Sequence, residues 1–504
     1  MSSTAFLGVD VGTSGVKAIV VADDGEVLAS ETAPLTLDAP RPGWAEQDPS
    51  SWWRATVSAI ASVAESTDAE IVAVGLTGQM HSSVFLDGSG DVIRPALLWC
   101  DGRTTAECRE ITDRAGGEDR LREWVRNPAL EGFTLPKVLW LRNHEPAAYE
   151  RLATVLLAKD YIRYRLTGTL ATEPSDASGT LMFDTAGGRW SAEILEAVGV
   201  SPSLLPELGG SSDVLGRVTA EASAVTGLSA GTPVVGGGAD NACGAAGVGV
   251  VRPGEAVASW GTSGTVLAPV AEPAVDPDLR AHTFCHVAPG TWYIMGVVLS
   301  AGGAFAWYRE RFGGPAAGAD PEGLNAALNQ EAAEAPRGSD GVTFLPYLQG
   351  ERTPHRDAAA RGALLGLSLS HGRSHVTRAV LEGICFAMRD SLEILRSMEL
   401  APDHLLLTGG GAKSPFIRRL QAEVYGLPVT TVNREEGPAY GAALLAAVGA
   451  GAFPDLGRAA DATLERGSLE APEDGAHEAY EEAYARYRAS YGDTIRADRH
   501  GSAA

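Results

Sequence analysis

The sequence predicts an α/β protein built from two large domains. Its 504 residues are too many for a single hydrophobic core. Apolar segments typical of strands alternate with helical segments over most of the chain, which favours an α/β sheet. One phrase also occurs twice, roughly half the chain apart, as Gly12-Thr13-Ser14-Gly15 and Gly261-Thr262-Ser263-Gly264. Because both copies follow apolar runs, we expect a duplicated half-domain.

The first elements form a predicted β-meander. Residues 5–9 and 16–21 are apolar strands on either side of the first glycine turn, and a third strand starts at Glu26. The segment Asp23-Asp24-Gly25 between the second and third strands is a hairpin signal. We therefore expect three consecutive antiparallel strands at the start of the chain.

A helix and a buried strand follow the meander. The helix is expected from about Pro49, with Asp48 as its N-cap. Residues 71–76 are a predicted apolar strand, which ends in the polar loop Thr77-Gly78-Gln79-Met80-His81. Helices and strands continue to alternate to about residue 230, and we place the first domain at residues 1–249.

The second domain is predicted to repeat this beginning. Residues 231–238 form a strand that ends in glycines, and a second meander starts at residues 256–260. Residues 405–411 are another buried strand that runs into glycines. Later helices are expected at about residues 301–312, 374–396, 415–425 and 438–448. We place this domain at residues 250–455 and assign residues 456–504 to a peripheral helix and tail.

Charge and cysteine usage limit the partners and the compartment. The formal net charge of −24 argues against nucleic acid or an anionic membrane as a partner, because both require basic patches. The five cysteines are scattered and fit free thiols better than disulfides or a zinc site. The sequence shows neither a charged-then-apolar leader nor a long uncharged apolar run. We therefore expect a cytoplasmic protein.

Two aspartates at strand ends are the candidate acids. Asp10 lies at the end of the first strand, where a carboxylate could hold Mg²⁺ bound to phosphates. The alternative role for Asp10 is to cap its own turn. Asp240 follows a strand that ends in glycines, and with Asn241 beside it could accept a proton from a substrate hydroxyl. The alternative role for Asp240 is a helix N-cap.

A second set of side chains suits a polyhydroxylated ligand. Gln79 and His81 offer an amide and an imidazole for hydrogen bonds to a polyol, and Met80 offers an apolar wall. Trp99 could face a sugar ring or chain. The alternatives are a structural histidine in a loop and a buried aromatic residue beside a turn.

The glycine turns are candidate phosphate sites. Their amides, together with the Thr and Ser hydroxyls, can hold the oxygens of an anion. Residues 409–414 lead from a strand into a helix, a geometry able to pass close under adenine and ribose. This segment has neither the spacing of a Walker loop nor that of a dinucleotide-binding turn. Two equivalent turns indicate a nucleotide held from both sides.

Together these segments resemble the FGGY family of carbohydrate kinases, within the actin, hexokinase and Hsp70 ATPase superfamily. Residues 132–144 resemble the first family signature, and residues 362–367 with 375–382 resemble the second. The likeness covers about residues 5–450. It implies an α/β fold of two actin-like ATPase (ribonuclease H-like) domains with a ligand cleft between them.

The resemblance also implies an activity. Within the family, Gly78-Gln79-Met80-His81 resembles the pentulose-binding motif, which implies ATP-dependent phosphorylation of D-xylulose at its terminal O5. ATP and Mg²⁺ are the implied cofactors, and a homodimer is the implied assembly. Asp240 is implied as the catalytic base, and Asp10 as the metal ligand and phosphate organiser. The sugar contacts are expected from Gln79, Met80, His81, Trp99, Asp240 and Asn241. The ATP contacts are expected from Gly12, Thr13, Ser14, Gly261, Thr262, Gly410, Gly411 and Ser414.

Two other functions stay open at this point. A few pocket side chains could move the preference to another pentulose or a polyol, such as ribulose or a pentitol. The same scaffold could also serve a non-catalytic sugar or ATP sensor, although the retained Asp10 and Asp240 count against one. Sugar-stimulated release of ADP separates a kinase from a sensor.

Overall fold

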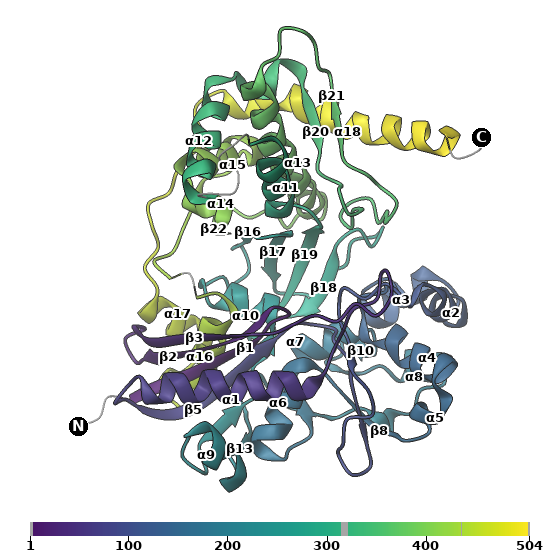
Figure 1. The fold of residues 1–504 in the computed structure, drawn as a ribbon, viewed down its shortest axis with the longest axis vertical. Coiled ribbons are helices and arrows are strands. Elements are labelled where there is room, and N and C mark those ends of the chain that lie inside the picture. The colour runs from purple at the N-terminus through teal and green to yellow at the C-terminus, as the bar shows by residue number, and fades with distance from the viewer. Residues whose placement is uncertain (1–3, 314–320, 435, 502–504) are drawn as a thin grey trace.

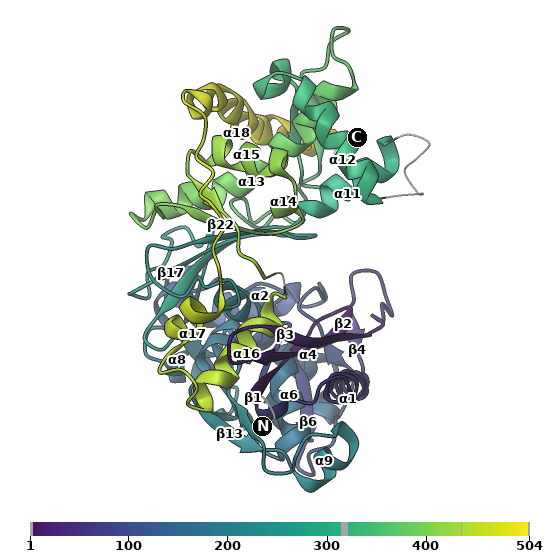
Figure 2. The ribbon, with the colours of Figure 1, turned by 90° about the vertical axis from the view of Figure 1, so that its left-hand side faces the viewer.

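The chain forms a lower and an upper body in the orientation of Figure 1. The computed structural model describes residues 4–313, 321–434 and 436–501. The N-terminal strands lie in the lower body, and the strands that follow the second glycine turn lie in the upper body. Figure 2 shows the same two bodies from the side, one above the other.

The lower body is built on a seven-stranded sheet with the strand order β13-β14-β5-β1-β2-β3, in which β15 also pairs with β5. The predicted meander is confirmed, since β1, β2 and β3 pair antiparallel in sequence. Helix α1 (Pro49–Glu65) begins as predicted, because the carboxylate of Asp48 accepts a hydrogen bond from the Ser50 amide at 2.9 Å. The strands are β1 (Thr4–Val11), β2 (Gly15–Ala22), β3 (Val27–Pro34), β5 (Glu70–Gly78), β13 (Val214–Arg217), β14 (Pro233–Val235) and β15 (Gly238–Ala239).

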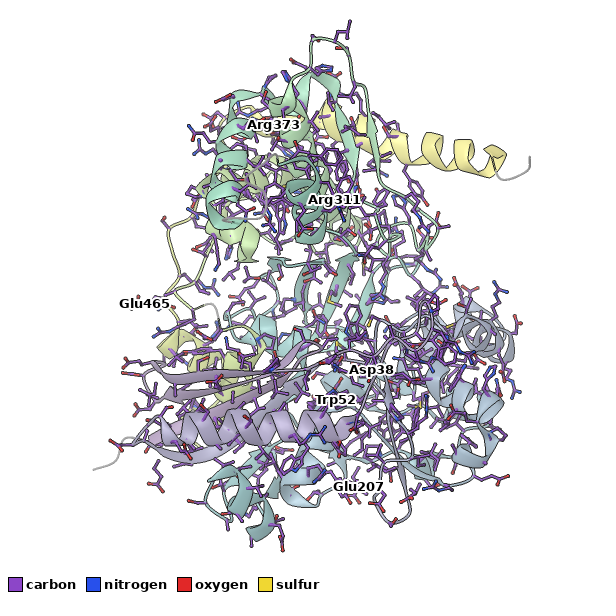
Figure 3. All side chains as sticks on the ribbon, in the orientation of Figure 1. Asp38, Trp52, Glu207, Arg311, Arg373 and Glu465 are labelled. Atoms are coloured by element: carbon purple, nitrogen blue, oxygen red, sulfur yellow. The ribbon has the colours of Figure 1, made fainter. Side chains whose placement is uncertain are left out.

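The upper body is built on a six-stranded sheet with the order β18-β19-β17-β16-β22-β23. Its strands are β16 (Val257–Trp260), β17 (Gly264–Val270), β18 (His282–Cys285), β19 (Trp292–Val298), β22 (Leu405–Gly409) and β23 (Val429–Thr430). Among the helices placed around it are α11 (Gly302–Phe312), α12 (Pro321–Glu334), α13 (Arg373–Ser397) and α15 (Pro415–Tyr425). Arg311 at the end of α11 and Arg373 at the start of α13 mark this body in Figure 3.

The two sheets share one topology. In the lower sheet, β1 pairs antiparallel with β2 and parallel with β5, and β5 pairs parallel with β14. In the upper sheet, β16 pairs antiparallel with β17 and parallel with β22, and β22 pairs parallel with β23. Each repeated glycine turn therefore joins the first and second strands of its sheet. This equivalence confirms the duplication that the repeated phrase predicts, and it makes Ser259 the counterpart of Asp10.

The lower body carries further helices on the side of the sheet opposite the upper body and beyond its edge. They include α2 (Thr105–Ala115), α3 (Glu118–Val125), α4 (Thr134–His144), α6 (Ala158–Thr167), α7 (Pro174–Ala177), α8 (Ala192–Val198) and α9 (Ala220–Thr226). Helix α10 (Asp240–Ala246) lies instead between the lower sheet and the upper body (Figure 1). Within the described ranges, none of the helices combines the length and the apolar character that a membrane span requires.

One helix of the predicted second domain lies in the lower body. Helix α16 (Pro438–Gly449) packs on β1 and β5, and its backbone comes so close that only glycine fits beneath it. A Cβ built at Gly8 would lie 2.0 Å from the carbonyl oxygen of Ala439, and one at Gly75 would lie 1.9 Å from that of Ala442. Since α16 is apolar on all sides, it needs cover from both the sheet and α10. Helix α16, which lies within the predicted second domain at residues 250–455, therefore packs on the sheet of the first domain.

The chain then crosses back to the upper body. Helix α17 (Leu456–Thr463) packs against α16, and the segment after it runs antiparallel to residues 429–432. Glu465 lies on this segment, at the side of the molecule between the two bodies (Figure 3). Helix α18 (Ala476–Gly501) follows in the upper body. The prediction of a peripheral last helix is wrong for its first half, because Tyr480, Tyr484 and Tyr487 are buried in the upper core.

Candidate active site

Two carboxylates flank the end of strand β5. Asp10 is the second-last residue of β1, and Asp240 opens helix α10 directly after β15. Strand β5 pairs with both neighbouring strands at the same residue, since Thr77 lies opposite Asp10 on one side and opposite Gly238 on the other. The parallel register thus brings both carboxylates to one edge of the sheet, as in other parallel α/β sites.

Burial raises the pKa of both carboxylates. Burial raises the pKa of Asp240 to about 7, and the nearby charge of Asp10 adds to the increase. Burial also raises the pKa of Asp10 to about 6, although Lys17 opposes that shift. The Oδ1 atom of Asp240 accepts hydrogen bonds from the Asn241 amide at 2.7 Å and from Asn241 Nδ2 at 2.9 Å. Asp240 is therefore an oriented carboxylate that can take up a proton near neutral pH.

The chemistry of Asp10 fits a divalent cation. Its Oδ1 atom is shielded from solvent and has no hydrogen-bond partner. The described residues contain no group of three or more His, Cys, Asp or Glu side chains that could enclose a metal. Mg²⁺ usually keeps few protein ligands and completes its shell with water and phosphate oxygens. The residues present therefore fit Mg²⁺ held by a substrate phosphate and Asp10.

A cavity of about 990 Å³ lies between elements of the two bodies, beside Asp240. The lower body contributes Asp240, Asn241 and Pro438, and the upper body contributes Ser259, Thr265 and Gly410. The predicted site residues Asp240, Asn241 and Gly410 thus share one cavity. Its size is within the range of small-molecule and cofactor sites.

The first glycine turn is hydrogen-bonded to Trp99 and Gln79, two of the residues predicted to contact a polyhydroxylated ligand. The indole Nε1 of Trp99 donates a hydrogen bond to Thr13 Oγ1 at 3.0 Å, and Thr13 Oγ1 donates to Gln79 Oε1 at 3.0 Å. Gln47 Nε2 donates to the carbonyl oxygen of Thr13 at 2.8 Å. Trp99, Thr13 and Gln79, all predicted site residues, therefore form one chain of hydrogen bonds. The Thr13 hydroxyl is already engaged by protein groups. Gly12 and Ser14 flank Thr13 in this turn and do not line the large cavity.

The second glycine turn supports a helix. The carbonyl oxygens of Gly261 and Thr262 accept hydrogen bonds from Gly302 at 2.8 Å and from Gly303 at 2.9 Å, at the start of α11. Their carbonyl groups therefore face α11, and neither residue lines the cavity.

Gly411 and Ser414 lie behind Gly410 and have structural contacts. A Cβ at Gly411 would lie 2.7 Å from the indole of Trp260, so glycine permits this packing. Ser414 is the N-cap of α15, with its hydroxyl accepting from the Ile417 amide at 3.4 Å. Neither residue lines the cavity.

Met80 and His81 form a neutral wall next to Asn241. Asn241 Nδ2 lies 3.6 Å from Met80 Sδ, and the Tyr293 hydroxyl lies 3.9 Å from the same sulfur. His81 Nδ1 donates to the carbonyl oxygen of Gly179 at 2.5 Å, which leaves Nε2 as an acceptor. Burial, followed by the charge of Lys137, lowers the pKa of His81 to about 3, so the ring is uncharged at neutral pH.

Some cavity residues were absent from the sequence prediction. Ser259 could have been found by aligning the two glycine phrases, because it stands where the first copy has Asp10. Thr265 follows the second phrase directly. Arg434 and Pro438 reach the cavity from the crossing segment that leads into α16, and no local pattern marks that crossing.

The fold and the site define a two-domain phosphotransferase with a duplicated ATPase-type sheet and a pair of carboxylates at the edge of one copy. Residues 5–247 match the N-terminal domain of the FGGY family of carbohydrate kinases, and residues 256–450 match the C-terminal domain. The chain therefore belongs to the FGGY family, and it is a carbohydrate kinase.

Individual relatives are similar to this protein in sequence or structure over almost the whole chain. The chain is 38% identical to a xylulose kinase of Bacillus subtilis strain 168 over 491 residues, 97% of each chain. A crystal structure of xylulose kinase from Rhodospirillum rubrum matches with a TM-score of 0.90 and 33% identity, covering 98% of this chain and 100% of that one. A gluconate kinase structure from Lactobacillus acidophilus matches with a TM-score of 0.91 and 27% identity, covering 98% and 100%. Similarity of fold therefore does not by itself select the sugar.

Proposed function

We propose that this kinase transfers the γ-phosphoryl group of ATP to the terminal O5 hydroxyl of D-xylulose. The observation that carries the proposal is the place of Asp240, which lines the large cavity and contacts Asn241 next to the Met80 and His81 wall. A carboxylate between a nucleotide-sized cavity and a neutral polar wall suits a base that acts on a sugar hydroxyl.

Asp240 is the proposed general base. As the O5 oxygen forms its bond to the γ-phosphorus, Asp240 accepts the O5 proton, and the bond between that phosphorus and its bridging oxygen breaks to release ADP. Such transfers depend mainly on positioning and charge stabilisation rather than on covalent chemistry by the protein. The pKa of about 7 allows Asp240 to be ionised before the transfer and protonated after it.

The nucleotide is proposed to occupy the cavity between the bodies, which Gly410 lines, with its phosphates extending beyond that cavity toward the turns at Gly12–Ser14 and Gly261–Thr262. Gly411 and Ser414 support the segment that carries Gly410. Asp10 would hold Mg²⁺ through its unpartnered Oδ1 atom. When bound, the cation neutralises charge on the phosphate oxygens.

The neutral wall supports an uncharged substrate. His81 offers an uncharged Nε2 acceptor, and Met80 presents an apolar surface. Trp99 and Gln79 are held in place through Thr13, so the substrate would meet side chains whose positions are already fixed. A ketopentose with several hydroxyls suits this set better than a sugar acid, which carries a carboxylate. The likeness to several xylulose kinases agrees with this substrate.

Coupled measurement of ADP release over a sugar panel tests the proposal. The panel holds D-xylulose, D-ribulose, a pentitol, glycerol and gluconate, with Mg²⁺ and ATP, and Asp240→Asn serves as the inactive control. D-xylulose is expected to give the highest kcat/KM. A higher kcat/KM for another sugar of the panel would reassign the substrate. If no sugar of the panel stimulated the release of ADP, the proposed phosphoryl transfer would be contradicted.

A further inference from the structure

Five charged side chains behind Asp240 are completely buried. Lys159 Nζ lies 2.7 Å from Asp160, 3.3 Å from Asp176 and 3.5 Å from Glu173, and Arg163 lies 3.0 Å from Asp160. All five side chains have no exposed surface. Burying ionic groups costs more free energy than their attraction returns unless their geometry is well satisfied. A cluster of this kind beside an active site therefore suggests a function beyond stability.

Five hydrogen bonds, arranged in three separate connections, join this cluster to the segment that leads into Asp240. Arg163 Nη2 donates to the carbonyl oxygen of Gly236 at 2.5 Å. The Ala239 amide donates to Ser175 Oγ at 2.9 Å, and Ser175 Oγ donates to Glu173 Oε1 at 2.8 Å. On the other side, Glu173 Oε2 accepts from the Ser211 hydroxyl at 2.9 Å, and the Gly237 amide donates to the Ser211 carbonyl oxygen at 2.8 Å.

The anchored segment has little stiffness of its own. It reads Gly236-Gly237-Gly238-Ala239, and Gly237 has a φ of 69°, where only glycine is readily accommodated. A Cβ at Gly237 would lie 1.8 Å from the Leu76 carbonyl oxygen, so the glycine cannot be replaced by a stiffer residue. The position of Asp240 therefore depends on contacts from outside the segment.

The cluster sets two cations against three carboxyl groups. Lys159 lies within 3.5 Å of Asp160, Glu173 and Asp176, and Arg163 lies 3.0 Å from Asp160. Burial raises the pKa of Asp176 well above its ordinary value, and both of its carboxyl oxygens lack a hydrogen-bond partner. The carboxyl group of Glu173, held beside Lys159, accepts hydrogen bonds from the hydroxyls of Ser175 and Ser211.

We propose that Glu173 and Ser175 are positioning residues for the phosphoryl transfer, holding the Ala239 amide so that the Asp240 carboxylate meets the sugar hydroxyl. Lys159 and Arg163 hold Glu173 and Gly236 in turn. This inference rests on the proposed role of Asp240 as the base. It assigns a task to fully buried residues that do not line the cavity.

The test compares Ser175→Ala with Ser191→Ala. Both serines are fully buried in the same body, and Ser191 caps α8 away from Asp240. A displacement of the base of about 1 Å can cost on the order of a hundredfold in rate. We expect Ser175→Ala to lower kcat by about tenfold to a hundredfold, with the KM for D-xylulose and for ATP unchanged. Ser191→Ala should keep the wild-type kcat even where its unfolding midpoint falls.

Two further variants keep the result decisive. Ser211→Ala removes the second contact to Glu173 and should lower kcat less than Ser175→Ala, and it replaces Ser175→Ala if that variant does not fold. A folded Ser175→Ala or Ser211→Ala enzyme with wild-type kcat would overturn the inference, and so would an equal loss of kcat in Ser191→Ala. Asp240→Asn is assayed in parallel. If Asp240→Asn itself kept the wild-type kcat, the base assignment would fail, whatever the serine variants showed.

Discussion

The indole Nε1 of Trp99 lies 3.0 Å from the hydroxyl of Thr13, which joins the first glycine turn to a side chain proposed to contact the sugar. The same hydroxyl donates to Gln79 Oε1. Thr13 was expected from the sequence to contact ATP. The hydrogen bonds favour a different task, in which Thr13 fixes Trp99 and Gln79, the two side chains proposed to contact the sugar.

Thr13→Val should therefore raise the KM for the sugar by about tenfold and change the KM for ATP little. The variant leaves the Trp99 and Gln79 groups unpaired, which costs about 1–3 kcal/mol for a buried polar group. Steady-state kinetics with each substrate varied in turn measures the difference. Thr32→Val is the control, since it makes the same replacement at an exposed position on β3. A raised KM for ATP with an unchanged KM for the sugar would restore the nucleotide role.

Asp240→Asn should lower kcat by at least about a hundredfold while the fold is kept. The amide retains the shape of the carboxyl group but cannot accept the proton. The free energy of unfolding at pH 8 should be equal to or higher than that of the wild type, because a buried charge with a raised pKa has been removed. Urea denaturation together with the ADP assay measures both effects. A folded variant with near-normal kcat would remove Asp240 from catalysis.

Gly75→Ala should lower the free energy of unfolding by about 1–3 kcal/mol, the usual cost of overpacking a core. The new methyl group would lie 1.9 Å from the Ala442 carbonyl oxygen, so α16 has to move away from β5. Chemical denaturation measures the loss. Gly88→Ala is the matched control, since a Cβ there would meet no atom within 4 Å. Equal stability of the two variants would show that α16 does not pack so closely on the sheet.

Asp390→Asn should flatten the decline of stability with rising pH. Burial raises the pKa of Asp390 to about 7, and the Tyr484 hydroxyl donates to its carboxyl group at 2.6 Å. A raised folded-state pKa means that the folded protein holds the proton more tightly than the unfolded chain. Its stabilisation is thus complete below about pH 4 and is lost as the pH rises through 7.

In the wild type this single group changes the free energy of unfolding by at most about 1.4 kcal/mol per pH unit across that window. The Asn variant lacks this contribution. Denaturation curves at pH 5, 6, 7 and 8 compare the slopes, with the surface change Asp403→Asn as the control for net charge. Parallel slopes in wild type and Asp390→Asn would mean that Asp390 does not retain its proton in the fold.

The parts of the fold that could be predicted are those that depend on short stretches of sequence. Alternating apolar runs identified the paired meanders, and the glycines after each strand identified the edge where Asp10 and Asp240 lie. The hydrogen bonds of Thr13 could not be predicted, because a glycine-hydroxyl phrase does not say which way its hydroxyl points. The placement of α16 and the burial of Tyr480 depend on contacts between segments distant in the chain. The spacing of apolar residues within one segment cannot predict such contacts.

The docking of α16 on β1 and β5 also determines when the N-terminal hydrophobic core can be completed during synthesis. The ribosome releases β1 first and α16 more than 400 residues later. Until then the N-terminal sheet lacks α16, the helix that covers Gly8 and Gly75 in the folded protein. The nascent N-terminal half is thus an unfinished domain, and it becomes a closed hydrophobic core only when nearly the whole polypeptide has been made.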